Sequence, residues 1–508
     1  MKILLIYPQY PETFWGLKYA LKFIAKKAAL PPLGLVTVAA MLPRDWERKL
    51  VDMNASALTD AQLEWADFAF ISAMTIQEKS TREVIDRCKK KGLKIVAGGP
   101  LFTTHSSDFE MLVDHLVLGE AEGSIPALLA NLEKASSQQV SDRYVYKCED
   151  WPDIRQTPPP EWSLIDLKKY DTIGIQYSRG CPFDCDFCDI VILNGENPRQ
   201  KNKDQILTEL ETLYQLGWRG SVFFVDDNFI GNKALLKKEL LPALINWLKQ
   251  KNYPFHFNTE TSINLADDEE LMQLMGQAGF DKVFVGIETP HEESLAECNK
   301  FHNQNRDLVA SVKKMQNHGF EVMGGFIIGF DNDPPSIFEK QIHFIQKSGI
   351  ITAMVGLLTA VRGTSLYQRL ESENRLIHEA TGNNTDFTLN FIPKMNREIL
   401  VNGYRKVLKT IYTPREYYKR VITFMKEFKP FPRRKKIRIK RADVWIFAKT
   451  IWHLGIKNKG RFYYWKLLSW TILRRPRLFG NAITYAIVGF HFRKMFVAQT
   501  VTSSIQSR

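Results

Sequence analysis

Short apolar runs alternate with longer segments of helical character through most of this chain. In the first 150 residues the apolar runs are Lys2–Tyr7, Lys49–Asp52, Phe68–Ser72, Lys94–Ala97 and His115–Leu118. Short continuous runs of this kind, separated by helices, are typical of a parallel sheet that helices cover on both faces. The sequence therefore predicts a doubly wound, Rossmann-like α/β domain over residues 1–149.

Sheets of this type bind their ligands beyond the carboxyl ends of the strands. The residues expected there are small or polar: Asn54, Ser72, Thr75, Gly98, Gly99 and the pair Gly119-Glu120. Each of them is also common in an ordinary strand-to-helix turn. The residues alone leave a ligand site and a set of plain turns both open.

A second β/α rhythm follows a proline-rich segment. DWPDIRQTPPPE (Asp150–Glu161) contains four prolines and suits neither a helix nor a central strand, so we expect a linker over residues 150–169. The next expected strands are Thr172–Tyr177, Ser221–Val225, Phe255–Thr259, Lys282–Ile287, Glu321–Ile328 and Ala353–Leu358. Six such units predict a partial (βα)6 barrel over residues 170–380, with its working residues at the carboxyl ends of the strands.

Three of the six cysteines lie directly after the first barrel strand, in SRGCPFDCDFCDI (Ser178–Ile190). Cys181, Cys185 and Cys188 have the spacing C-x3-C-x2-C, and no second pair is present to complete a zinc site. An iron–sulfur cluster normally takes four thiolates. Three thiolates would leave one iron of a four-iron cluster open to a substrate or a second cofactor.

This spacing after the first strand of a partial barrel resembles the radical S-adenosylmethionine superfamily. The resemblance implies that the three cysteines hold a [4Fe-4S] cluster. Its open iron would chelate S-adenosylmethionine, and one electron would give a 5′-deoxyadenosyl radical. It also implies cofactor contacts at the strand ends, namely Asp226 and Asn228 for the methionyl amino group, Glu260 for the ribose or carboxylate, Glu288 after the fourth strand, and Gly325 to Gly329 for the adenine.

A Rossmann-like domain before such a barrel resembles the cobalamin-binding class of the superfamily. The matching residues are Leu30–Leu35 (LPPLGL), the Ser72 and Thr75 pair, the Gly98-Gly99-Pro100 turn and Gly119-Glu120. The D-x-H-x-x-G motif of other cobalamin domains is absent, because Asn54 stands where its histidine would be. The resemblance thus implies cobalamin without an imidazole ligand from that position.

The charge of the chain is strongly asymmetric. The formal net charge is +13, yet the residues from Lys394 onward carry 28 Lys and Arg against 4 Asp and Glu. We expect a basic, aromatic, helical C-terminal domain over residues 381–508, with an anionic partner. Trp and Tyr among Leu, Ile and basic residues favour a membrane surface over nucleic acid. A basic helical domain that is simply folded or solvated is the third possibility.

Two further features bear on location. MKILLIYPQY at the N-terminus is typical of a buried strand and not of a secretion signal, and the apolar run near residues 482–490 is too short to span a bilayer. We therefore expect a cytoplasmic protein, peripheral on the inner face of the membrane.

The order of the three parts is similar to that of hopanoid C-2 methylases, and Ile411–Met425 (IYTPREYYKRVITFM) resembles their C-terminal domain. The resemblance implies methyl transfer through cobalamin to an unactivated carbon of a lipid such as a hopanoid. It also implies an electron donor such as flavodoxin or ferredoxin. Two alternatives stay open: a non-methylating radical enzyme, such as an oxidative cyclase, and a redox-sensing binding protein, against which the strand-end motifs argue.

Overall fold

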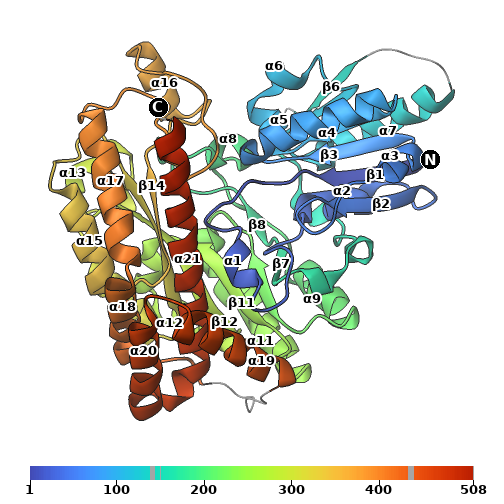
Figure 1. The fold of residues 1–508 in the computed structure, drawn as a ribbon. Coiled ribbons are helices and arrows are strands. Elements are labelled where there is room, and N and C mark those ends of the chain that lie inside the picture. The colour runs from blue at the N-terminus through green and yellow to red at the C-terminus, as the bar shows by residue number, and fades with distance from the viewer. Residues whose placement is uncertain (138–142, 149, 433–439, 507–508) are drawn as a thin grey trace.

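The computed structural model describes residues 1–137, 143–148, 150–432 and 440–506, and only the backbone of 135–137 and 497–506. Figure 1 shows three parts: an N-terminal α/β domain, a central β/α unit and a C-terminal helical layer. The most basic run predicted for the C-terminal domain, residues 433–439, lies outside the described residues.

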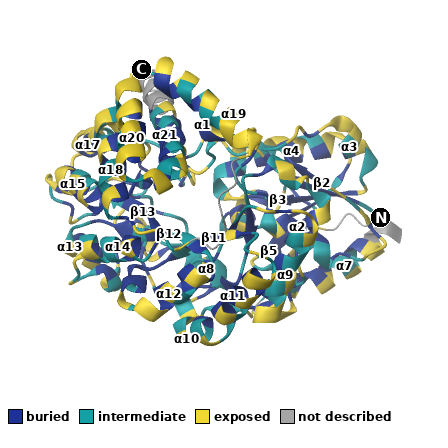
Figure 2. Ribbon diagram, turned by 90° about the horizontal axis from the view of Figure 1, so that it is seen from below, coloured by how far each residue is buried: buried dark blue, intermediate teal, exposed yellow. Residues whose placement is uncertain are grey.

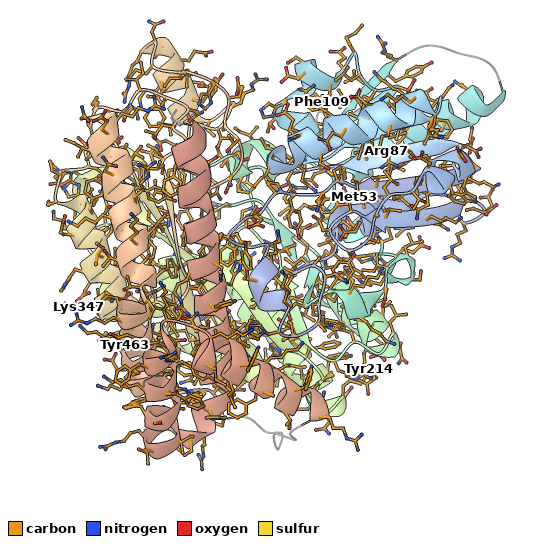
Figure 3. All side chains as sticks on the ribbon, viewed as in Figure 1. Met53, Arg87, Phe109, Tyr214, Lys347 and Tyr463 are labelled. Carbon is orange, nitrogen blue, oxygen red and sulfur yellow. The ribbon has the colours of Figure 1, made fainter. Side chains whose placement is uncertain are left out.

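The N-terminal domain is a six-stranded parallel sheet in the order β2-β1-β3-β4-β5-β6. Its strands are β1 (Lys2–Tyr7), β2 (Glu47–Asp52), β3 (Phe68–Ser72), β4 (Lys94–Gly98), β5 (His115–Leu118) and β6 (Tyr144–Lys147). Its helices are α2 (Leu33–Met41), α3 (Asp60–Trp65), α4 (Glu78–Lys90), α5 (Pro100–Thr104), α6 (Ser106–Phe109) and α7 (Ala121–Ser137). The doubly wound fold is confirmed. Its apolar layers include the buried Phe109, labelled in Figure 3.

The second sheet has six parallel strands in strict chain order, from β7 to β14, as an open barrel requires. They are β7 (Thr172–Ile175), β10 (Ser221–Phe224), β11 (His256–Thr261), β12 (Phe280–Glu288), β13 (Glu321–Ile328) and β14 (Ala353–Leu357). The covering helices are α9 (Lys203–Gln215), α11 (Leu241–Gln250), α12 (Glu269–Gln277), α14 (Leu308–Asn317) and α15 (Ile337–Ser348). The predicted partial barrel is confirmed.

Side chains alternate between the two faces of this sheet. Val283 and Val285 of β12 are fully buried on the outer face, against the helices. Phe284, between them, lies on the inner face, and in the register of the sheet it adjoins Glu260 of β11 and Met323 of β13. The inner face of the barrel is thus lined by side chains that are only partly buried.

Each edge strand of the barrel is covered by another part of the chain. On one side, α17 (Arg397–Tyr412) packs on β14, and the Tyr404 and Tyr412 hydroxyls donate to the Val355 and Ala353 carbonyls at 3.0 and 2.7 Å. On the other side, residues 27–29 run beside β7, with the Thr172 amide donating to the Ala29 carbonyl at 3.0 Å. Such cover removes the exposed edges of the sheet.

Two segments from opposite ends of the chain bridge the gap between those edges. They are α1 (Lys18–Leu21), which leads into residues 27–29, and α21 (Phe479–Gln506), which packs on α17. Both views show α1 beside α21 (Figure 1 and Figure 2). The N-terminal and C-terminal parts therefore meet across the open side of the barrel.

The remaining C-terminal helices are α18 (Pro414–Glu427), α19 (Arg441–Thr450) and α20 (Arg461–Arg474), and a π-helical turn, Ile451–Ile456, continues α19. The predicted helical character is confirmed. Tyr463, labelled in Figure 3, lies on α20. Within the described part of the chain, none of the helices is both long and apolar enough to traverse a bilayer.

Candidate active site

The cysteine loop begins at a short hairpin. Strand β8 (Ser178–Arg179) pairs antiparallel with β9 (Arg199–Gln200), and Gly180 follows with a φ of +97°. A Cβ atom at Gly180 would lie 2.8 Å from the Gly195 carbonyl oxygen and 3.0 Å from that of Asn194. Only glycine fits this tight turn. It directs the chain into Cys181, whose amide donates to the Gly195 carbonyl at 3.2 Å.

The donor set of the loop suits an iron–sulfur cluster. Burial raises the pKa of Cys185 to about 11, and the charge of Lys300 acts on all three thiols of the loop in the opposite sense, so all three feel the field of the same cation. Soft thiolates from a single loop are the ligands that iron–sulfur clusters take. Cys298 is close by, but its thiol donates to the Leu295 carbonyl at 3.6 Å within an apolar cluster.

Two aspartates after β10 hold the start of the cysteine loop. Asp226 accepts hydrogen bonds from the Tyr177 amide at 3.1 Å and from the amide and hydroxyl of Ser178. Asp227 accepts from the Gly180 amide and the Asn194 side chain, both at 3.0 Å. Burial raises the pKa of Asp226 to about 7. The structure thus gives Asp226 a backbone-anchoring contact, and its contact with S-adenosylmethionine stays a prediction.

The strand ends place Asn228 and Glu260 on the same side of the barrel. The Asn228 amide group exchanges hydrogen bonds with Ser262, at 3.2 Å from the Ser262 backbone and 3.3 Å to its hydroxyl. Burial, with the charges of Asp227 and Asp226, raises the pKa of Glu260 to about 8. Glu260 therefore carries a proton at neutral pH and can donate a hydrogen bond to a ligand oxygen.

A buried ion pair lies beside the cysteine loop. Glu288 ends β12 with a φ of +61°, and its carboxylate is 2.7 Å from the Lys300 ammonium. A Cβ atom at Gly286 would lie 2.8 Å from that ammonium, so glycine keeps the space open for the pair. Sequence reasoning predicted Glu288 but missed Lys300. Lys300 comes after helix α13 (Glu292–Glu297) and not at the end of a strand, where functional residues are expected. It reaches the site only through the fold.

The predicted glycine segment begins on the inner face of β13, at Gly325. It ends just after the carboxyl end of the strand, at Gly329. A Cβ atom at Gly325 would lie 2.9 Å from Phe284 Cζ, so the Phe284 ring lies across β13 at this point. Gly329 has a φ of +113°, and its amide donates to Asp333 at 2.8 Å. The predicted contact of this segment with adenine stays a prediction.

In the N-terminal domain, Asn54 is turned inward. Its side chain accepts from the Tyr10 amide at 3.0 Å and donates to Asp52 at 2.8 Å, while the Tyr170 hydroxyl donates to Asp52 at 2.9 Å. Asn54 thus fixes the loop after β1. Its contact with cobalamin stays a prediction.

The other predicted residues of this domain border its loops. A Cβ atom at Gly99 would lie 2.7 Å from the Ser72 hydroxyl, and one at Gly98 would lie 3.2 Å from the Val117 carbonyl. Thr75 lies against Gly382, where an added Cβ would be 3.1 Å from Thr75 Cβ. At Gly119, by contrast, an added Cβ would meet no described atom within 4 Å. A compact glycine turn beside open space suits the close approach of a large, flat ligand.

Charged residues join this domain to the cysteine loop. Arg179, two residues before Cys181, pairs with Glu120 at 2.5 Å and with Glu122 at 2.8 Å. Arg199 pairs with the other oxygen of Glu120. Sequence reasoning named Glu120 as a possible ligand-binding residue. The structure instead pairs it with both arginines of the β8–β9 hairpin, for which the sequence contained no signal.

Three family models match the chain in succession. They are the B12 binding domain over residues 25–129, the radical SAM superfamily over residues 175–345, and a domain of unknown function (DUF4070) over residues 364–507. The first two fall on the N-terminal sheet and on the barrel. The third falls on the C-terminal helices.

Relatives match nearly the whole chain. A protein named as an uncharacterized methyltransferase of Synechocystis sp. is 40% identical, over 97% of this chain and 91% of its own length. A hopanoid C-2 methylase of Rhodopseudomonas palustris is 34% identical, over 96% of this chain and 92% of its own length. Among solved structures, the cobalamin-dependent S-adenosylmethionine radical enzyme OxsB with aqua-cobalamin bound has a TM-score of 0.64 at 13% identity, covering 99% of this chain and 80% of its own.

Proposed function

This chain belongs to the family of cobalamin-dependent radical S-adenosylmethionine methyltransferases, and we propose that it methylates an unactivated carbon of a membrane lipid, a hopanoid. The proposal of this substrate depends on one observation. The likeness to a protein named as a hopanoid C-2 methylase spans the barrel, the N-terminal sheet and the C-terminal helices alike.

The proposed reaction exchanges a carbon-bound hydrogen for a methyl group. One S-adenosylmethionine gives up its methyl group and leaves as S-adenosylhomocysteine. A second takes up the substrate hydrogen and leaves as 5′-deoxyadenosine and methionine. Two electrons from a protein donor, such as flavodoxin or ferredoxin, balance the exchange. When bound, the [4Fe-4S] cluster and cobalamin supply the radical and methyl-transfer chemistry.

The residues of the chain would bind and orient the cofactors and the substrate, and would exclude water from the site. Cys181, Cys185 and Cys188 would hold the cluster, and the Lys300 ammonium beside them would receive the carboxylate of S-adenosylmethionine. The protonated Glu260 would donate a hydrogen bond to a cofactor or substrate oxygen. These roles are proposals that agree with the charge and burial of each group.

Membrane association fits the surface of the C-terminal helices. We define the aromatic patch as the exposed large apolar side chains from α19 to α20: Val444, Trp445, Trp452, Ile456, Phe462, Trp465, Ile472 and Leu473. Figure 2 shows exposed residues along α19 and α20. Basic residues accompany the patch, and Lys457 lies 4.6 Å from the centre of the Trp452 ring. Aromatic groups among lysines and arginines suit an anionic bilayer surface.

Expression in a bacterium that makes hopanoids but lacks a C-2 methylase tests the proposal. Membranes of cells that express the chain should contain methylated hopanoids, with the methyl group derived from methyl-labelled methionine. The matched control is the Cys188→Ala variant, which should leave the hopanoids unmethylated. Unchanged lipids with an iron-loaded wild-type enzyme would overturn the choice of substrate. An oxidised or cyclised product without labelled methyl would instead favour the oxidative alternative.

A further inference from the structure

An aromatic side chain from the N-terminal domain reaches the barrel. The chain that leaves β1 is anchored by Phe14, which is buried and stacks on Phe492 of α21, with ring centroids 4.2 Å apart and planes at 14°. His491 of α21 contacts the Phe14 carbonyl at 3.2 Å. Trp15 is the next residue, and it is 40% exposed. The anchor at Phe14 therefore fixes the position of a tryptophan that is itself not part of the core.

Trp15 meets the inner face of the barrel at Phe284. The two rings are edge to face, with centroids 5.5 Å apart and planes at 80°. The Phe284 ring in turn lies across β13 at Gly325, where any side chain would collide with it. An edge-to-face pair is a preferred aromatic geometry. Trp15 and Phe284 together form an aromatic wall that joins the N-terminal segment to the inner face of the barrel.

The surroundings of this wall are apolar. Met323 is the register neighbour of Phe284, and Met354 of β14 is the register neighbour of Gly325. Both methionines are half-buried on the inner face. Glu260, on the other side of Phe284, is the carboxyl group whose pKa burial raises to about 8, so it adds no charge at neutral pH. Flat rings with thioethers at neighbouring register positions suit a rigid hydrocarbon.

The wall leads toward the reacting end of the site. Along β12 from Phe284, Gly286 and then Glu288 follow on the same face, and Glu288 pairs with Lys300 beside the cysteine loop. A ligand that lies along the wall would therefore have one end near the three cysteines. Its other end would point toward α1 and α21, which close the open side of the barrel.

From this geometry we infer that Trp15 and Phe284 seat the ring system of the substrate, and that Trp15 determines specificity for a flat, polycyclic hydrocarbon. The inference rests on the proposed function and deepens it, because it names the residues that would recognise the rings. The wall combines a segment of the N-terminal domain with a strand of the barrel. Only the docked arrangement of the two domains completes it.

The test uses the whole chain, loaded with iron and cobalamin, and a pentacyclic triterpene hydrocarbon, diploptene, in detergent micelles. Equilibrium binding is measured for the wild type and for Trp15→Ala, Trp15→Phe and Phe284→Leu. Trp65→Ala is the matched control, since Trp65 lies on α3 against Lys49, in the N-terminal domain. S-adenosylmethionine affinity and iron content report whether each variant keeps its fold and its cofactor site.

We expect Trp15→Ala to weaken diploptene binding about tenfold, the loss of one aromatic contact, while Trp15→Phe and Trp65→Ala stay close to the wild type. Phe284→Leu should weaken binding to a smaller extent. If Trp15→Ala loses iron, Phe284→Leu decides. If Trp15→Ala and Phe284→Leu both bind diploptene as tightly as the wild type does, the inference about the two rings is overturned, while the proposed substrate is not. A wild type that binds no diploptene at all would overturn both the inference and the proposed substrate.

Discussion

Arg179 in the cysteine loop and Glu120 in the N-terminal domain form a buried ion pair, with 2.5 Å between Nη1 and Oε2. Their side chains are 12% and 6% exposed. Glu122 is the second partner of Arg179, at 2.8 Å. Arg179 stands two residues before Cys181 in the chain. The pair therefore connects the domain that matches the B12-binding model to the loop that would carry the cluster. The pair is thus one of the contacts that hold the N-terminal domain against the cysteine loop.

Replacing Arg179 with Gln should therefore loosen the docking of the N-terminal domain. Glu120 keeps Arg199, but Glu122 loses its ion pair, and breaking a buried pair on one side costs about 3–5 kcal/mol. We expect a lower thermal unfolding midpoint and faster proteolysis within residues 150–169, while Lys314→Gln, which breaks an exposed pair with Glu269, leaves both unchanged. Equal proteolysis rates for the wild type and Arg179→Gln would show that the pair does not hold the domains together.

The Lys300 ammonium should contribute to cofactor affinity. Lys300→Met, combined with Glu288→Gln so that no buried carboxylate is left unpaired, removes the cation beside the three cysteines. We expect the iron content to stay the same and the affinity for S-adenosylmethionine to fall about tenfold or more, since a charge-assisted hydrogen bond is lost. The electron paramagnetic resonance spectrum of the reduced cluster, recorded with and without S-adenosylmethionine, measures the effect. Lys313→Met, at a pair with Glu427 far from the loop, is the control.

Glu260 should make the apo protein less stable as the pH rises. Burial raises the pKa of this group from 4.5 to about 8, so the folded state binds a proton that the unfolded state releases above pH 4.5. The free energy of unfolding should therefore fall as the pH rises from about 4.5 to about 8, and then level off. Glu260→Gln removes this dependence.

Urea titrations at a series of pH values measure the difference between Glu260→Gln and the wild type. The variant should gain stability over the wild type progressively between pH 5 and pH 8. A difference that does not change with pH would mean that Glu260 is ionised in the folded chain.

The aromatic patch should bind anionic vesicles. Trp452→Ser and Phe462→Ser replace two side chains of the patch that are 50% and 69% exposed, one in the π-helical turn after α19 and one in α20. Together they should reduce co-sedimentation with phosphatidylglycerol vesicles at least tenfold, because each ring contributes about 1–3 kcal/mol when buried. Met111→Ser changes an exposed apolar residue of the N-terminal domain and should have no effect. If the double variant still binds the vesicles, and high salt abolishes that binding, then the basic residues alone are responsible for it.

The sequence predicted both sheets because their buried strands are continuous apolar runs. It missed β6, because Tyr144–Lys147 is short, ends in a lysine and follows a polar stretch. It extended β7 to Tyr177, whereas the strand ends at Ile175, because the Tyr177 and Ser178 amides donate to Asp226 and not to a neighbouring strand. Local propensity contains no information on such a side-chain partner.

The site was predicted less completely than the fold. The three cysteines were found from their spacing, which is a local property. Lys300, Trp15 and the Arg179–Glu120 pair depend on contacts between segments far apart in the chain, and nothing in their immediate sequence marks them. Asn54 was placed correctly at the end of β2, but the sequence could not show that its side chain turns inward to Tyr10 and Asp52.

The most direct test of the account is a single turnover assay under anaerobic conditions. The enzyme, loaded with iron and cobalamin, is supplied with a reductant, with S-adenosylmethionine labelled in its methyl group, and with a hopanoid in anionic vesicles. We predict labelled methylhopanoid together with equal amounts of 5′-deoxyadenosine and S-adenosylhomocysteine. Formation of 5′-deoxyadenosine that depends on the hopanoid, with no labelled methyl group in the lipid, would contradict it.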